Sequence, residues 1–394
     1  MSRALARVLA AGLVFLALTT CDLFNKTPLR LQIEDIATKD PEWTLVTPNG
    51  VTPAGVTAGS RFGAAVDMSA SYAIVGAPYS AEGGTNRGAA FVFARQSDGT
   101  WQFQQKLTSE TKLDNEYFGA AVAITGSYAV VSSTGASMVE VYELSAGTWT
   151  KVTEFAKTGT YGFAVDIDGP YLAVGSYGAG TVDIYYRSGT WAFQRQVLQS
   201  SAYRFGYSLS LSGDYLAVGA DYYNLSASNG GAVYVYQRSG TNWPQIAFFE
   251  PSTATLNERY GRSVAISNAC LAVGARITTK VYFYKLNGST WQYDTELSVP
   301  GTVSGDEFAC SLATTGSSVI AGAYNSSSGT GCAYAFWNKN GTWSYKSKLA
   351  YSGGAIGDNF GTGVRASGNS MIIGAPLDDN SLGTDAGSIF FYSY

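Results

Sequence analysis

The side chains best suited to binding a ligand are tyrosines that recur at one point of a repeated pattern. They follow apolar runs that end near a glycine, and they are Tyr79, Tyr177, Tyr222 and Tyr324, with Tyr223 directly after Tyr222. Exposed tyrosine rings anchor protein partners or stack against sugars, because an apolar ring carries a polar edge. The alternative interpretation is that each ring packs beneath its own loop.

Charged side chains form a second recurring set, shortly before the aromatic residue that opens each repeat. The basic members are Arg61, Arg204 and Arg259, and the acidic members are Asp114, Glu116, Glu258, Asp306, Glu307 and Asp358. We expect most of this charge to be solvated and the arginines to meet a ligand bound near the centre of one face. Two carboxylates at about 5 to 9.5 Å would also suffice for glycoside hydrolysis.

Several kinds of chemistry are excluded by composition. Histidine is absent from the 394 residues, which removes Ser-His-Asp and Cys-His catalysis and the commonest metal ligand. The net charge of −4 argues against nucleic acid, which binds a basic patch.

A repeated phrase positions these residues. Each copy begins with an aromatic residue and a small residue, which open a short alternating run, called A. A tight turn leads to an apolar run B that ends in Gly-Ala. After a loop comes an aromatic run C, and a tryptophan then opens run D. The copies open at Phe62, Phe118, Tyr161, Phe205, Tyr260, Phe308 and Phe360. A spacing of roughly 50 residues fits four strands, which make one blade of a β-propeller.

The two ends of the series predict a closed ring. The tryptophans of run D are Trp43, Trp101, Trp149, Trp191, Trp243, Trp291 and Trp343. No runs A to C precede Trp43, and the last copy ends at its run C, residues 388–392. The N-terminal strand should therefore complete the C-terminal blade, because closure hides strand edges. The sequence predicts an all-β, seven-bladed propeller over residues 41–394.

This strand order separates two faces. The A–B and C–D turns are mostly short and share one face, while the B–C loops and D–A connectors vary in length and share the other. Binding residues concentrate on variable loops held by a rigid scaffold. The B–C and D–A face is the predicted binding face. The recurring glycines are interpreted as points of close backbone approach.

The N-terminus predicts export. Residues 1–21 have the basic start, short apolar core and Cys21 of a signal peptide of lipoprotein type, and the apolar core is too short to span a membrane. Lipidated Cys21 would anchor the protein to a membrane of the cell envelope through a tether, residues 22–40. The alternative is ordinary signal cleavage and a periplasmic or secreted protein. Cys270, Cys310 and Cys332 are expected to be free, buried thiols, and the protein a monomer.

The repeated motif resembles the FG-GAP repeat. It runs from Phe-Gly-x-Ala/Ser-Val through Val-Gly-Ala-Pro to Gly-x-Ala-Tyr-Val-Tyr. The best copies are residues 62–93, 118–142, 205–236 and 360–392. The resemblance implies an integrin-α-like propeller of the kind found in bacterial exported proteins, which binds or adheres through one face and is not an enzyme. Integrin-type repeats often carry a calcium loop, and its nearest counterpart here is Asp378, Asn380 and Asp385. Two ligand positions are lost, so only a weak calcium site is expected.

The function predicted from the sequence is non-enzymatic binding of a protein or surface ligand on the B–C and D–A face, with no cofactor apart from that weak calcium site. A carbohydrate-binding, lectin-like propeller is the alternative. A glycosidase is less favoured, because the sialidase motif Ser-x-Asp-x-Gly-x-x-Trp has only a shortened counterpart in residues 97–101. Membrane contact is expected only through the lipidated N-terminus.

Overall fold

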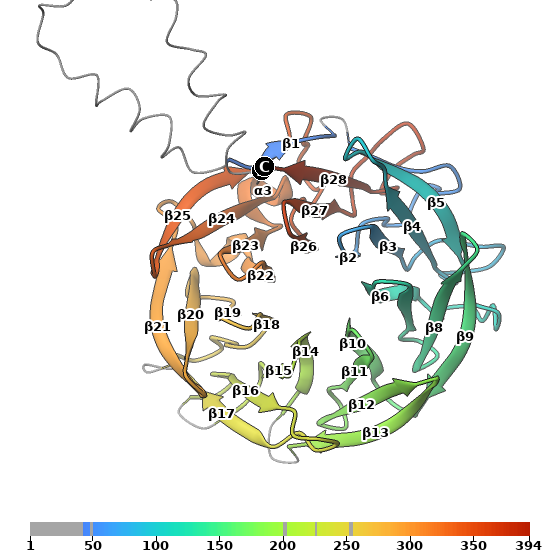
Figure 1. Cartoon of the computed structure of the whole chain (residues 1–394). Coiled ribbons are helices and arrows are strands. Elements are labelled where there is room, and N and C mark those ends of the chain that lie inside the picture. Colours follow the sequence, from blue (N-terminus) through green and yellow to red (C-terminus); the bar gives the residue numbers. More distant parts are fainter. Residues whose placement is uncertain (1–41, 48–49, 200–202, 225–226, 252–254) are drawn as a thin grey trace, which may run out of the picture. The chain divides into compact units, whose positions relative to one another are not determined.

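The repeated phrase folds into seven four-stranded antiparallel sheets arranged in a ring, as predicted (Figure 1). A computed structural model of the chain describes residues 42–47, 50–199, 203–224, 227–251 and 255–394. The predicted signal peptide, Cys21 and the predicted tether lie outside these residues. Residues Trp43–Tyr394 form one compact unit. In the described part of the chain, no helix has the length and apolar character needed to cross a membrane.

Every blade runs from an innermost strand A to an outermost strand D. Blade 1 is β2 (Ala65–Met68), β3 (Tyr72–Ala77), β4 (Ala89–Arg95) and β5 (Trp101–Leu107); blade 2 is β6 (Phe118–Thr125), β7 (Tyr128–Ser133), β8 (Met138–Ser145) and β9 (Thr148–Ala156); blade 3 is β10 (Tyr161–Asp168), β11 (Tyr171–Ser176), β12 (Thr181–Ser188) and β13 (Thr190–Leu198). Blade 4 is β14 (Phe205–Ser212), β15 (Tyr215–Ala220), β16 (Ala232–Gln237) and β17 (Gln245–Phe249); blade 5 is β18 (Ser263–Ile266), β19 (Cys270–Gly274), β20 (Lys280–Asn287) and β21 (Thr290–Ser298). Blade 6 is β22 (Phe308–Thr314), β23 (Ser318–Ala323), β24 (Cys332–Lys339) and β25 (Thr342–Leu349); blade 7 is β26 (Val364–Ser367), β27 (Ser370–Ala375), β28 (Ser388–Ser393) and β1 (Thr44–Leu45).

Within the described residues, two short helical turns lie in the loops. η2 (Ser304–Asp306) precedes blade 6, and α3 (Ser326–Gly329) lies between β23 and β24. Ser327 and Ser328 of α3 have left-handed backbone angles, with φ of 55° and 62°. α3 is therefore a tight turn and not a regular helix.

The burial of each strand follows its place in the blade. The B strands are buried on both faces, as in β23 and β27, because neighbouring blades cover them. The outermost strands alternate between buried and exposed residues, as in β9. The core consequently lies between blades, where the apolar faces of successive sheets meet.

The N-terminal strand closes the ring. β1 pairs with β28, so that Thr44 lies opposite Ser393 and Leu45 opposite Tyr392. The buried Trp43 ring packs edge-on against Tyr394, with 4.5 Å between ring centroids. This contact joins the first and last strands of the propeller. The unmatched first tryptophan and the missing run D of the last copy predicted this closure.

The glycines of strand B allow adjacent blades to approach, which confirms the interpretation from the sequence. A Cβ atom on Gly76 would lie 1.9 Å from the carbonyl oxygen of Gly119 in the next blade, and one on Gly374 would lie 2.0 Å from that of Gly63. Any larger residue would push two blades apart.

The three described cysteines are free thiols, as expected. Cys270 and Cys332 are buried, and burial raises the pKa of Cys270 to about 12. Cys310 differs from the expectation, because it is only partly buried and lines the central channel.

Candidate functional site

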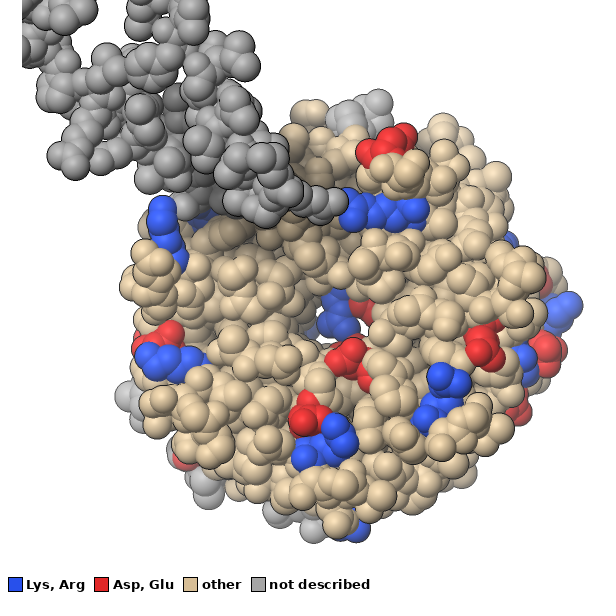
Figure 2. Space-filling view, in the orientation of Figure 1, with Lys and Arg blue, Asp and Glu red and all other residues tan. Residues whose placement is uncertain are grey.

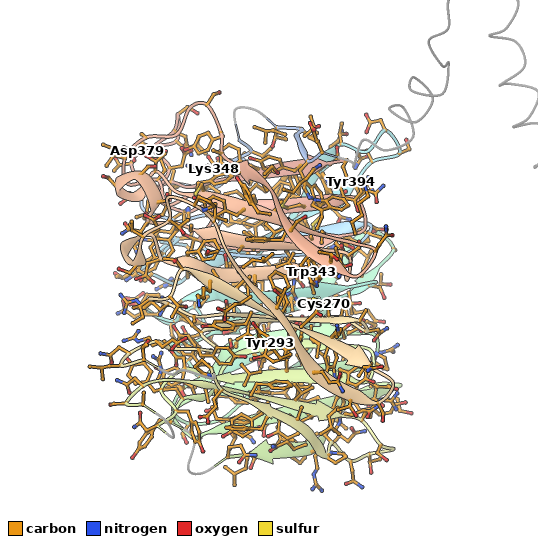
Figure 3. The ribbon with its side chains drawn as sticks, turned by 90° about the vertical axis from the view of Figure 1, so that its left-hand side faces the viewer. Cys270, Tyr293, Trp343, Lys348, Asp379 and Tyr394 are labelled. Carbon is orange, nitrogen blue, oxygen red and sulfur yellow. The ribbon has the colours of Figure 1, made fainter. Side chains whose placement is uncertain are left out.

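Two faces of the ring carry different segments. We call the face of the A–B and C–D turns the turn face, and the face of the B–C loops and D–A connectors the loop face. In the side view, Asp379 of a B–C loop lies toward one edge of the disc, and Tyr394, which contacts Asn369 in the A–B turn of blade 7, lies toward the opposite edge (Figure 3). The predicted site residues of blades 1 and 3 to 7 all belong to the loop face.

Arginine–tyrosine pairs recur on the loop face. The guanidinium carbon of Arg61 lies 4.2 Å from the centre of the Tyr79 ring, and that of Arg204 lies 4.6 Å from the centre of the Tyr222 ring. Both arginines have left-handed backbone angles, with φ of 54° and 62°. Tyr117, Glu307 and Asn359 have the same conformation at the equivalent position of other blades, so it belongs to the repeated D–A connector.

Blades 3 to 5 gather the largest group of such side chains, which we call the aromatic–arginine cluster. Its members are Phe163, Tyr177, Arg204, Tyr207, Tyr222 and Arg259. Arg204 lies 3.8 Å from the centre of the Tyr207 ring and 5.0 Å from that of Tyr177. Arg259 lies 4.5 Å from the centre of the Tyr222 ring and donates a hydrogen bond to its hydroxyl group. Cation–π contacts thus hold the two guanidinium groups in place.

Two buried carboxylates lie beside this cluster and pair with arginines of the loop face. Asp221 Oδ2 is 3.4 Å from Arg204 Nη1. Glu307 is 2.7 Å from Arg276 Nε and 3.4 Å from Arg262 Nη2. Burial raises the pKa of Asp221, and the neighbouring arginines oppose that shift. Three guanidinium groups therefore pair with two carboxylates at this part of the loop face.

The loop-face mouth of the central channel adjoins the cluster. It holds a cavity of about 250 Å³, to which Tyr207, Arg262 and Cys310 contribute. These three residues occupy the third position of successive copies of the repeat, counted from the opening aromatic residue. In β14 a register shift between Phe205 and Ser208 places Tyr207 in a bulge, and a bulge redirects a side chain away from the regular pleat.

The five predicted tyrosines do not form one ring of equivalent side chains. Tyr177 and Tyr222 belong to the aromatic–arginine cluster, whereas Tyr79 lies in blade 1 beside Tyr117, with 5.3 Å between ring centroids. Tyr223 packs beneath its loop against Phe248 and Tyr234. Tyr324 is half-buried near Glu307, and burial raises its pKa.

Most of the connector carboxylates are buried, so the expectation of solvated charge was wrong for them. Glu116, Glu258, Asp306 and Asp358 all turn into their own D–A connectors. The carboxylate of each accepts a hydrogen bond from the backbone N–H three residues earlier, for example from Leu113 to Glu116 over 2.9 Å. These groups satisfy backbone donors in tight loops and are unavailable as a solvent-facing catalytic pair.

The predicted calcium residues form a hydrogen-bonded turn. Asp378 accepts hydrogen bonds from the hydroxyl groups of Ser388 at 2.5 Å and Tyr351 at 2.7 Å. The Asn380 side chain donates to the carbonyl oxygen of Gly387, and the backbone N–H of Asp385 donates to Asp379. Among the described residues there is no cluster of three or more Asp, Glu, Cys or His suited to a metal ion. The calcium site stays a prediction.

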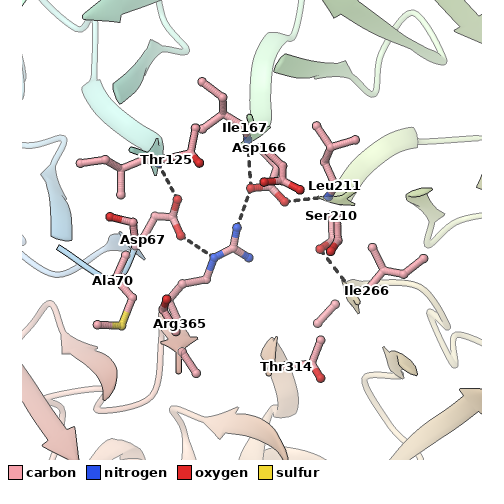
Figure 4. Close-up of a pocket in the computed structure, with 18 residues that line it drawn as sticks. Asp67, Ala70, Thr125, Asp166, Ile167, Ser210, Leu211, Ile266, Thr314 and Arg365 are labelled. Atoms are coloured by element: carbon pink, nitrogen blue, oxygen red, sulfur yellow. Dashed lines mark hydrogen bonds and ion pairs between the residues drawn. The ribbon is translucent and has the colours of Figure 1, made fainter. Parts of the chain in front are cut away.

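A second polar site, which the sequence interpretation missed, occupies the centre of the ring. Arg365 of β26 extends into the channel between two buried carboxylates (Figure 4). Its Nε is 2.5 Å from Asp67 Oδ1 in blade 1, and its Nη2 is 2.6 Å from Asp166 Oδ1 in blade 3. Together with Ser210 they line a cavity of about 310 Å³ toward the turn face. Figure 2 shows basic and acidic atoms inside the central hollow.

These central carboxylates also cap the inner edges of neighbouring blades. Asp67 accepts a hydrogen bond from the backbone N–H of Ile124 at 2.6 Å, and Asp166 accepts one from that of Leu211 at 2.8 Å. Asp67, Asp166, Ser210 and Arg365 all occupy the sixth position of their copies of the repeat, counted from the opening aromatic residue. That position differs between copies, and its variation was the available signal for the site.

Asp166 is strongly desolvated, and this changes its response to pH. Burial raises the pKa of Asp166 to about 6, although Arg365 opposes the shift. This value lies above the ordinary pKa of about 3.9 in an unfolded chain. The contribution of Asp166 to stability is therefore complete below about pH 4 and is lost as the pH rises through about 6.

This shift gives a pH prediction. We expect the urea midpoint of the native protein, relative to that of Asp166→Asn, to fall as the pH rises from about 4 to about 7. Unfolding followed by tryptophan fluorescence at several pH values measures this difference. Asp214→Asn, at an exposed position on the turn face, is the matched control. A difference between the native protein and Asp166→Asn that does not change with pH would contradict the assignment.

The fold and the sites define a seven-bladed propeller with a variable loop face and charged side chains in its central channel. The sequence matches the family model of the FG-GAP repeat over residues 49–93, 101–142, 199–236 and 343–392. The chain belongs to the FG-GAP repeat family. Propellers of this family are generally non-catalytic, and their fold suits a binding role. A search of the curated proteins found no match.

Solved structures share the architecture at low sequence identity. A chain of the mitotic checkpoint complex is 13% identical, with a TM-score of 0.56 over 96% of this chain and 98% of that chain. A protein from Lactobacillus plantarum is 14% identical, with a TM-score of 0.55 over 74% and 86%. An inactive variant of virginiamycin B lyase from Staphylococcus aureus, solved with quinupristin, is 10% identical, with a TM-score of 0.56 over 90% and 100%. These similarities establish the fold alone.

Proposed function

We propose that this protein is an exported, non-enzymatic binding protein that holds a protein or surface ligand on the loop face, at the aromatic–arginine cluster. The observation that carries the proposal is the convergence of Arg204 and Arg259 on the rings of Tyr177, Tyr207 and Tyr222 beside an open cavity. Tyrosine and arginine are the side chains enriched at the energetic centres of protein interfaces.

The direction of the N-terminal strand supports this choice of face. Trp43 contacts Tyr394, which bonds to the A–B turn of blade 7, so the chain enters the propeller from the turn face. In the proposed lipoprotein, the tether from Cys21 therefore joins the propeller on the turn-face side. The loop face therefore does not hold the point at which the tether joins the propeller.

Carbohydrate binding is the second candidate. It is favoured by the partly exposed rings of Phe163 and Tyr79, since flat aromatic faces stack against sugars. It is less favoured at Tyr222, because two guanidinium groups already lie over that ring. Hydrolysis of a sugar is not proposed, because the connector carboxylates are bound to their own loops.

The proposal is tested with the purified full chain on an extracellular-matrix protein panel and a glycan array. For ligands that bind, Tyr177→Ala with Arg204→Ala should weaken affinity about tenfold or more, as expected for central interface residues. The matched control is Arg238→Ala on the turn face, where the guanidinium group stacks on Tyr171 at 5.0 Å. Equal loss in both variants, or no loss in the first, would refute the loop-face site. Glycan-only binding would favour the second candidate.

A further inference from the structure

The turn-face end of the central channel holds a polar cavity that the proposed function does not use. Its volume is about 310 Å³, at the lower end of the range for small-molecule sites. The central hollow opens on the turn face, which is the face seen in Figure 2. No aromatic side chain of the described residues lines this cavity, so a ligand with a flat apolar ring would find no stacking surface in it.

The cavity exists because the sixth position of the repeat differs between blades. Blades 5 and 6 have only Ala265 and Ala313 at this position. Arg365 of blade 7 reaches away from these blades, toward Asp67 of blade 1 and Asp166 of blade 3. The arginine therefore fills one side of the channel and leaves the side of blades 4 to 6 open (Figure 4).

Two hydrogen-bond donors face this open side. Arg365 uses Nε and Nη2 for the two carboxylates, and no described residue accepts a hydrogen bond from its Nη1, which points toward Ser210 in Figure 4. The buried Ser210 hydroxyl group accepts the backbone N–H of Ile266 at 3.2 Å. Because a hydroxyl group can accept and donate at once, Ser210 can still donate its own proton into the cavity.

Carboxylate oxygens supply acceptors in the same cavity. Asp166 Oδ2 accepts one backbone N–H, from Leu211 at 2.8 Å, and a carboxylate oxygen can accept two. Asp168 lies at the mouth and is only partly buried. Its Oδ2 accepts the backbone N–H of Gly213 at 2.6 Å, and its Oδ1 has no partner among the described residues. The cavity therefore combines donors and acceptors.

The charges of the walls disfavour an ionic ligand. An anion at the donors would lie near Asp67, Asp166 and Asp168, and a single guanidinium group cannot balance all of these carboxylates as well as the anion. A cation at the carboxylates would meet the remaining N–H groups of Arg365. A neutral hydroxyl group avoids both repulsions, because it can donate to a carboxylate and accept from a guanidinium group or a serine.

We propose that the turn-face end of the channel binds a small, neutral, polyhydroxylated molecule of about monosaccharide size, whose hydroxyl groups pair with Arg365, Ser210 and Asp168. This site is separate from the aromatic–arginine cluster and does not depend on the proposed function. The alternative is that water alone fills the channel, since water also satisfies buried polar groups.

The probes are glucose, galactose, mannose and myo-inositol, each titrated at millimolar concentration into the full chain by isothermal titration calorimetry. At least one should bind. Ser210→Ala and Asp168→Asn should each weaken that binding about tenfold, because each removes a hydrogen bond to the ligand. Circular dichroism checks that each variant is folded.

Two matched variants should bind the same probe as the native protein does. Ser208→Ala changes a serine of the same strand, β14, that lines the loop-face cavity instead. Asp214→Asn changes an exposed carboxylate of the turn face outside the channel. Glucosamine and glucuronate, the cationic and anionic counterparts of glucose, should each bind at least about tenfold more weakly than the best neutral probe.

The inference is overturned if no neutral probe binds, which would leave water alone in the channel. It is also overturned if folded Ser210→Ala or Asp168→Asn binds as tightly as the native protein, if the matched variants lose as much affinity, or if glucosamine or glucuronate binds more tightly. Binding that is lost in Tyr177→Ala with Arg204→Ala but kept in Ser210→Ala would place the sugar on the loop face and refute the channel site. The proposed function is measured on the protein panel and fails separately.

Discussion

Arg365→Met is expected to destabilise the propeller by about 3 to 5 kcal/mol, the usual effect of removing one partner from a buried ion pair. The substitution keeps the aliphatic stem but leaves Asp67 and Asp166 as buried carboxylates without their counter-charge. It also removes the direct link from blade 7 to blades 1 and 3. Urea unfolding followed by tryptophan fluorescence measures the loss.

Two comparisons separate charge from packing in this prediction. Arg365→Met combined with Asp67→Asn and Asp166→Asn should recover much of the stability, because no buried charge remains unpaired. The loss in Arg365→Met should also be smaller at pH 5 than at pH 7, since the raised pKa of Asp166 lets it accept a proton. A loss below about 1 kcal/mol at pH 7 would show that the contact resembles an exposed ion pair.

Trp43→Ala is expected to cost about 3 to 5 kcal/mol, as for other buried tryptophans. Trp43 is buried between the first and last strands, and it packs against Tyr394. Removing the ring should also free the edge of β28, because β1 pairs with β28 over only two residues. Hydrogen exchange of the backbone amides in β28 measures this opening, and urea unfolding measures the stability.

Trp149→Ala is the matched control for ring closure. Trp149 is a buried tryptophan at the same position of blade 2, where the chain is continuous on both sides. Both variants should lose stability, but only Trp43→Ala should increase exchange in β28. If the two variants give the same exchange in β28, Trp43 contributes to the core without closing the ring.

The architecture was predictable because it depends on a pattern that each blade repeats. Alternation in strand A, the apolar run of strand B and the tryptophan of strand D identify the same four strands in each copy. The unmatched first tryptophan, Trp43, and the missing fourth strand after β28 were sufficient to predict closure. The close approach of Gly76 to Gly119 followed from the same repeat.

The sequence predicted which face of the propeller holds the candidate site, but not which side chains form it. Tyr177, Tyr222, Arg204 and Arg259 do meet on the loop face, whereas Tyr223 turns into the blade. Whether a tyrosine points out or packs inward depends on the loops and blades beside it. The connector carboxylates were misjudged for a similar reason, because a backbone donor such as the N–H of Leu113 is not visible as a sequence motif.

From the sequence alone, the protein was determined to be a closed ring of seven blades with one variable face, because strand periodicity and tight turns are local properties of the chain. Only the tertiary structure decided what lies at the centre. Arg365 is separated from Asp67 by 298 residues and from Asp166 by 199 residues. The ring brings the same position of every inner strand to one axis. Substitutions at that position in three separate copies therefore meet there as the ion pairs of Arg365 with Asp67 and Asp166.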